Sequence, residues 1–210
     1  MVSDVVGEGV EAHACSLVGV VPNLSPDDGC EHRIDGRPGL LLDEVVTVTQ
    51  DRFGHHLPAD FLERFQAERA EEFRRELKPV QGAAELVQRV QAAGVPVCVA
   101  SQGKLAKTRL TLGLAGLDRL IPSDAVFSAY SVPRGKPHPD LFLYAAEQMG
   151  ADPAGCVVVE DTPLGVTAAV AAGMRVFGFS ADSDEAALRR AGAEILHSLD
   201  QLPALLGLDG

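Results

Sequence analysis

From Pro79 onward, short apolar runs alternate with helical runs, and this alternation constrains the fold more than any other feature of the chain. Apolar runs bounded by turn residues are typical of buried strands. Strands that alternate with helices form parallel sheets joined by right-handed crossovers. We therefore predict an α/β fold over residues 77–210, with a Rossmann-like parallel sheet flanked by helices. The predicted strands are Val95–Ala100, Ala125–Phe127, Val157–Val159, Arg175–Phe179 and Glu194–Leu196.

The first third of the chain predicts a small all-helical domain over residues 1–76. A helix begins near Leu42 and ends at Gly54, and a longer one opens near Pro58. Residues 1–40 are harder to assign. Within them, Ala14–Val21 fits either a strand or half of a buried helix, since periodicity cannot decide over so few residues. In the longer helix, helical spacing predicts one apolar face that points inward. Its residues are Leu62, Phe65, Phe73 and Leu77.

Composition excludes several classes of protein. The 210 residues are 46% hydrophobic and carry a formal net charge of −12, which argues against nucleic acid or an anionic membrane as a partner. No apolar run approaches a membrane span, and the first residues do not resemble a secretory signal. Cys98 and Cys156 lie in strand-like runs, where a thiol acts as a small hydrophobe. The cysteines show no metal-binding spacing, so we expect a reduced, cytoplasmic compartment.

Two acids stand at the end of a predicted strand in the stretch Cys156–Gly173. Glu160 and Asp161 follow four apolar residues and precede an alanine-rich helix that begins at Pro163. Open α/β sheets place their ligands at this end of the strands. Adjacent carboxylates there call for a cation, and Mg²⁺ is the natural candidate. A simple alternative is that both acids cap the next helix.

Two further polar segments follow predicted strands. Ser101, Gln102 and Gly103 offer a hydroxyl, backbone amides and a helix start, which suit a phosphate, although Ser101 as an ordinary helix cap explains them too. Lys136 stands between a glycine and a proline, where a fixed ammonium could pair with a phosphate or a carboxylate. The alternative for Lys136 is an ordinary surface lysine.

Taken together, these segments resemble the haloacid dehalogenase superfamily of phosphohydrolases, close to its beta-phosphoglucomutase-like and sugar-phosphate phosphatase branch. Ser101 in VASQG is similar to the second motif of that family, and Lys136 in RGKPHPD is similar to the third. Glu160 and Asp161 in VVVEDTPLG match the fourth. The resemblance covers about residues 40–205, and the helical unit resembles the mobile cap of the family.

The resemblance implies phosphoryl transfer through an aspartyl-phosphate, with Mg²⁺ bridging the nucleophile and the phosphate. It implies that Ser101 and Lys136 are catalytic, and that Ser101, Gln102, Gly103 and Lys136 bind the phosphorylated substrate. It implies that Asp161 binds Mg²⁺ directly, and Glu160 directly or through water.

The first motif of the family, Asp-x-Asp-Gly after an apolar strand, is absent. Asp35-Gly36 could be the end of this motif, but Arg33 occupies the position of the first aspartate, the nucleophile. Asp27-Asp28-Gly29 has the wrong spacing for the motif. Asp4 has the right distance from Gly7, but the second acid before that glycine is missing. We infer either that the chain begins inside the usual gene product or that the first core strand has been lost. In the family this strand lies in mid-sheet, so Ala14–Val21, the N-terminal residues or another chain should fill its place.

The sequence therefore predicts a Mg²⁺-dependent phosphatase scaffold for a small phosphorylated metabolite, a sugar phosphate, with activity impaired by loss of the nucleophile. Two alternatives remain, a non-catalytic phosphate- or partner-binding relative and a phosphomutase. We expect a monomer or homodimer, with neither nucleic acid nor membrane as a partner. Cap-side contacts to substrate could come from His55, His56, Arg64 and Arg69, although a solvated side chain is the simpler and more frequent explanation for each.

Overall fold

A six-stranded, fully parallel sheet forms the centre of the computed structural model, which describes residues 16–18, 41–54 and 56–208. The strand order is β3-β2-β1-β4-β5-β6, and every neighbouring pair is parallel. The predicted α/β class with a Rossmann-like parallel sheet is therefore confirmed. The strands are β1 (Ser16–Val18), β2 (Val97–Ser101), β3 (Val126–Ser128), β4 (Cys156–Glu160), β5 (Arg175–Phe179) and β6 (Glu194–Leu196).

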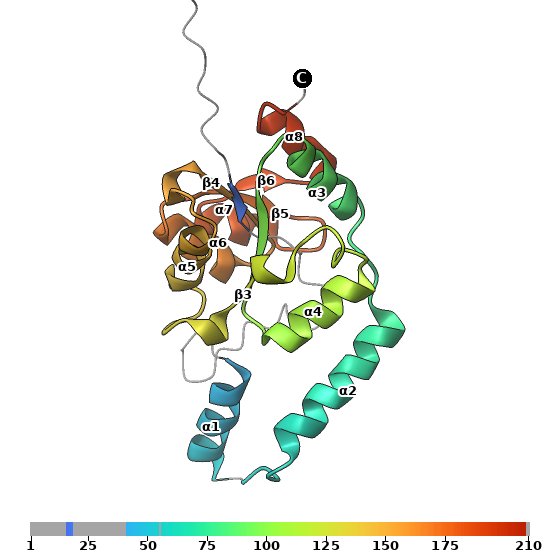
Figure 1. Ribbon diagram of the computed structural model, residues 1–210. Coiled ribbons are helices and arrows are strands. Elements are labelled where there is room, and N and C mark those ends of the chain that lie inside the picture. The colour runs from blue at the N-terminus through green and yellow to red at the C-terminus, as the bar shows by residue number, and fades with distance from the viewer. Residues whose placement is uncertain (1–15, 19–40, 55, 209–210) are drawn as a thin grey trace, which may run out of the picture.

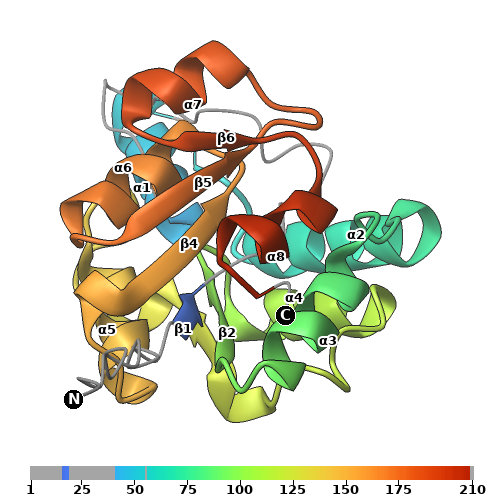
Figure 2. The same ribbon diagram turned by 90° about the horizontal axis from the view of Figure 1, so that it is seen from above.

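Helices cover both faces of this sheet (Figure 2). One face carries α3, α4 and α8, and the other carries α5, α6 and α7. The strands between them are nearly continuous apolar runs, as buried parallel strands require, and β4 is buried along its whole length. The bounds of these helices are α3 (Ala83–Ala92), α4 (Leu105–Leu114), α5 (Asp140–Gln148), α6 (Pro163–Ala171), α7 (Glu185–Ala191) and α8 (Leu202–Leu205).

The central position of the sheet belongs to β1, which pairs with β2 on one side and β4 on the other. Leu17 lies opposite both Val97 and Val157. A strand from Ala14–Val21, one of the three candidates for this place, occupies it. Local periodicity could not decide whether this segment forms a strand or part of a helix. Backbone pairing with β2 and β4 makes it a strand. The loss of the usual first core strand stays a prediction.

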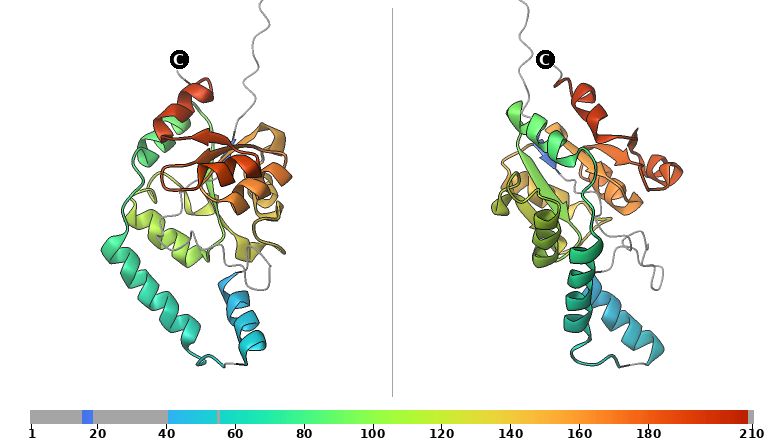
Figure 3. Two further views of the ribbon diagram at one scale, coloured as in Figure 1. Left: turned by 180° about the vertical axis from the view of Figure 1, so that it is seen from behind. Right: turned by 90° about the vertical axis from the view of Figure 1, so that its right-hand side faces the viewer.

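Two helices, α1 (Leu42–Phe53) and α2 (Phe61–Glu76), stand apart from the sheet at one end of the molecule (Figures 1 and 3). They match the expected helical unit. The range 1–76 is not helical throughout, because β1 falls inside it and pairs in the core sheet. The boundary between a cap and a core at residue 76 stays a prediction.

The apolar face predicted for α2 is correct only in part. Phe73 is buried at 4% exposure, whereas Phe65 is 36% exposed and stacks on Phe61 with ring centroids 6.1 Å apart. Helical periodicity gives the direction of a side chain but not whether another element covers it. Among the described residues, no helix combines the length and apolar character that crossing a membrane requires.

Candidate active site

The loop after β2 is held in a defined conformation by its own hydrogen bonds. Ser101 is the last residue of β2, and its Oγ accepts a 3.1 Å hydrogen bond from the backbone N–H of Gly103. The hydroxyl of Ser128, at the end of β3, donates to the carbonyl of Gly103 at 2.8 Å. Ser101 therefore stabilises a local turn, and its hydroxyl hydrogen is still a donor for a ligand.

Gln102 joins this loop to the segment that carries Lys136. The backbone N–H of Lys136 donates to Gln102 Oε1 at 2.9 Å. Gly135 allows the close approach, because a methyl group at its Cα would lie 2.5 Å from Gln102 Nε2. Two segments 34 residues apart in sequence are thereby fixed together beside the carboxyl end of β2.

Lys136 and Glu160 form a buried ion pair between their Nζ and Oε1 atoms. Lys136 is 9% exposed and Glu160 is 8% exposed. The ammonium also lies 4.9 Å from the centroid of the Phe142 ring, a favourable position for a cation. Lys136 is therefore not an ordinary surface lysine, and its ammonium group lies at the carboxyl end of β4.

The second oxygen of Glu160 is also engaged. Thr162 Oγ1 donates to Glu160 Oε2 at 3.1 Å and accepts from the N–H of Gly165 at 3.1 Å, so Thr162 is the N-cap of α6. A methyl group on Gly165 would overlap the carboxylate of Glu160. The carboxylate thus lies directly against the first turn of α6. Neither predicted acid is the helix cap, because Thr162 has that role.

The structure brings together most of the residues selected from the sequence. Ser101, Gln102 and Gly103 follow β2, Lys136 contacts both Gln102 and Glu160, and Asp161 is half-buried one residue beyond β4. Sequence reasoning missed Thr162 and Phe142 as partners. Threonine before proline at a helix start is a recognisable N-cap signal and could have identified Thr162.

Four residues of the helical unit were candidates for substrate contacts, and those that the structure describes form no hydrogen bond or ion pair with Lys136 or Glu160. His56 and Arg64 are exposed, and His55 lies outside the described residues. The guanidinium of Arg69 stands over the rings of Phe65 and Phe73, at 5.3 Å and 5.8 Å from their centroids. Arg69 therefore packs within α2.

The donor set at the end of β4 fits a magnesium ion of a particular kind. Mg²⁺ is commonly bound by one or two carboxylates together with waters and substrate phosphate oxygens. Glu160 and Asp161 supply carboxylates, although both oxygens of Glu160 already have protein partners. In residues 16–18, 41–54 and 56–208, no three His, Cys, Asp or Glu side chains gather as a metal cage. The donor set therefore fits an ion that would be held by carboxylate oxygens together with water and phosphate oxygens.

The chain thus has the architecture of the open α/β domains, here with a buried lysine–carboxylate pair beside two strand ends. As a class, these domains bind their ligands at the carboxyl edge of the sheet. Comparison with known proteins narrows this class. The family model described as haloacid dehalogenase-like hydrolase matches residues 9–173. The chain belongs to this family.

Two curated relatives from Escherichia coli (strain K12) are sugar-phosphate phosphatases. 6-Phosphogluconate phosphatase is 32% identical over 80% of this chain and 74% of its own length. Hexitol phosphatase A is 38% identical over 58% of this chain, which spans about half of that relative, 54% of its length.

Among solved structures, a HAD family hydrolase from Deinococcus radiodurans R1, crystallised with bound phosphate and sodium, is similar in fold and sequence. It superposes with a TM-score of 0.62 at 35% identity, and the match covers 81% of this chain and 78% of that one.

Proposed function

We propose that this protein binds the phosphate group of a small phosphorylated metabolite, a sugar phosphate, at the carboxyl ends of β2 and β4. The observation that carries the proposal is the buried Lys136, held by Glu160 on one side and joined through Gln102 to the loop after β2 on the other. A desolvated ammonium in a fixed position attracts a phosphate more strongly than a solvated one.

The loop after β2 supplies hydrogen-bond donors for the same phosphate. Ser101 offers its hydroxyl, and α4 begins at Leu105, with Lys104 as an N-cap residue that makes no side-chain cap. First-turn amides of a helix lack partners within the helix and favour anions. Ser101, the first turn of α4 and Lys136 would therefore act together as the hydrogen-bond donors to the bound phosphate.

Asp161, with Glu160, is the group we propose to hold Mg²⁺. The ion would supply charge neutralisation on the phosphate oxygens. Lys136 adds a second positive charge from the protein itself. Phosphoryl transfer depends largely on such positioning and charge stabilisation, which supports the proposed site for phosphate and Mg²⁺.

The covalent step is the part we propose to be impaired. In the family resemblance, the nucleophile is an aspartate directly after the central strand. That strand is β1, which ends at Val18, and residues 19–26 contain neither Asp nor Glu. Loss of a nucleophile typically costs several orders of magnitude in rate. A phosphate-binding relative with little turnover, in the cytoplasm, is the function we propose.

Hydrolysis of p-nitrophenyl phosphate and 6-phosphogluconate with Mg²⁺ tests this proposal, with Asp161→Ala as the matched variant. We expect rates near the uncatalysed background for both proteins. A turnover number near the enzyme median of about 10 s⁻¹, abolished in Asp161→Ala, would overturn the proposed impairment. The acids to replace next would then be Asp4, Asp27, Asp28 and Asp35.

A further inference from the structure

Three side chains from separate segments meet where α1 begins. Asp43 lies in the first turn of α1, Lys104 directly follows the loop Ser101–Gly103, and Tyr130 lies in the short turn η2 (Ala129–Ser131) after β3. Lys104 Nζ is 3.1 Å from Asp43 Oδ1 and 3.0 Å from Oδ2. The same ammonium lies 5.1 Å from the centroid of the Tyr130 ring. We call these three residues the α1 anchor.

The environment of Tyr130 follows from this arrangement. Burial raises the pKa of Tyr130, and the nearby Asp43 carboxylate raises it further. The Lys104 ammonium and the backbone amides of Leu42 and Asp43 act in the opposite direction. The phenol is therefore neutral at physiological pH and sits at the start of α1, among groups from both the cap side and the core side.

The second cap-side helix has a different attachment. In α2, Phe73 is 4% exposed, and Lys107 of α4 places its Nζ 5.7 Å from the Phe73 ring centroid. The two helices diverge from one another in Figure 1. Apolar burial thus fixes α2 on α4, whereas charge and an aromatic ring fix the beginning of α1 on the loop that follows β2.

We infer that the α1 anchor docks α1 beside the loop Ser101–Gly103 and so positions this helix against the organic part of a bound sugar phosphate. Asp43, Lys104 and Tyr130 are positioning residues. Lys104 is two residues beyond Gln102, and its ammonium is paired with Asp43 at the start of α1. We therefore assign Lys104 to holding α1, and contact with the phosphate stays with Lys136 as proposed above. This assignment rests on the proposed function for the identity of the ligand, and on the contacts above for the docking itself.

Hydrogen–deuterium exchange of the backbone tests the docking without any ligand. Lys104 and Asp43 are 39% and 43% exposed, and pairs of this kind shift an opening equilibrium by about two- to fivefold. We expect Asp43→Asn to raise exchange in α1 by that factor, with α3 and α5 unchanged. Asp51→Asn, an exposed acid on the same helix, is the control and should match the wild type. The reversed pair Asp43→Lys with Lys104→Asp should restore protection.

Titration calorimetry with inorganic phosphate and with 6-phosphogluconate tests the positioning. We expect Asp43→Asn to weaken 6-phosphogluconate by about two- to fivefold and to leave inorganic phosphate unchanged, since only the former extends beyond the phosphate. Equal weakening of both ligands, or no change in either, would overturn the positioning role. Unchanged exchange in α1 would overturn the docking. Failure of the wild type to bind either ligand would contradict the proposed function, and the exchange measurement would still decide the docking.

Discussion

At the scale of single residues, the Lys136–Glu160 pair is the ion pair of the site whose two side chains are both buried. Both side chains are almost fully removed from water, and each neutralises the other. The sequence indicated the two residues through their motifs but not their contact, which depends on how β4 and the Lys136 segment lie in space. Breaking such a pair costs more than the pair contributes, because one charge is left buried.

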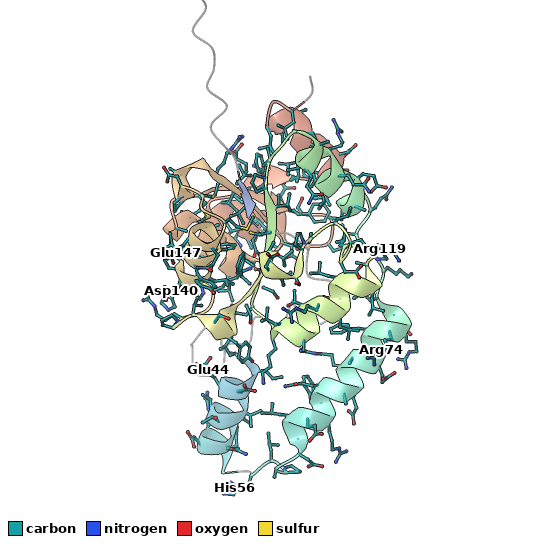
Figure 4. All side chains as sticks on the ribbon, in the orientation of Figure 1. Glu44, His56, Arg74, Arg119, Asp140 and Glu147 are labelled. Atoms are coloured by element: carbon teal, nitrogen blue, oxygen red, sulfur yellow. The ribbon has the colours of Figure 1, made fainter. Side chains whose placement is uncertain are left out.

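Glu160→Gln should therefore destabilise the fold. We expect a loss of about 3–5 kcal/mol in the free energy of unfolding, because Lys136 keeps its charge without a counter-ion. Urea denaturation followed by circular dichroism measures this. Glu147→Gln on α5, an exposed position labelled in Figure 4, is the matched control and should change stability by less than about 0.5 kcal/mol. Equal stability of the two variants would show that the pair is not buried as described.

Asp140 links the Lys136 segment to α5 through Arg134. Arg134 Nε and Nη2 donate to the two carboxylate oxygens at 3.0 Å and 2.8 Å. This hydrogen bonding from Arg134 lowers the pKa of Asp140 below the usual value for an aspartate. A lowered pKa stabilises the fold above the unfolded value, and that stabilisation is lost as pH falls through the folded pKa.

Asp140→Asn should consequently be less stable than the wild type at pH 7, and the difference should shrink as the pH falls below about 4. Urea midpoints at a series of pH values give the comparison. A difference that stays constant from pH 7 to acid would mean that the Arg134–Asp140 contact does not depend on the charge of Asp140.

At the scale of elements, the sequence was sufficient wherever a segment was long or bounded by clear turn residues. The predicted β5 and β6 match the structure residue for residue. It was insufficient for β1, which has only three residues and whose identity depends on pairing with β2 and β4. It also misjudged Phe65, since exposure depends on neighbours that helical periodicity does not reveal.

Leu17→Pro tests the place of β1 in the sheet. Proline removes a backbone N–H from the middle of the central strand, and such positions tolerate it poorly. We expect loss of the cooperative unfolding transition or a destabilisation of at least about 1–3 kcal/mol, the cost of leaving a buried backbone group without its hydrogen bond. Leu17→Val keeps the backbone donor and is the control. A proline variant that melts like the wild type would contradict the pairing of β1 with both neighbours.

At the scale of the whole molecule, the parallel order of the strands explains why residues far apart in sequence share one edge. The carboxyl ends of β2 and β4 flank that of β1, so Ser101 and Glu160 belong to the same end of the sheet. The alternation of strands and helices in the sequence predicted that these strand ends lie at the same end of a parallel sheet. The anchoring of α1 through Asp43 could not be predicted, because it joins three segments that no sequence periodicity connects.

The central claim is that Lys136 makes this edge a phosphate site. Titration calorimetry with inorganic phosphate and Mg²⁺ tests it on the wild type, on Lys136→Met combined with Glu160→Gln, and on Lys78→Met as an exposed control. The double variant removes both charges, so no charge is left buried. We predict saturable binding to the wild type and to Lys78→Met, and binding weakened about tenfold or more in the double variant, the size expected for a lost charge-assisted hydrogen bond. Equal affinity in all three proteins, or no binding to the wild type, would contradict the claim.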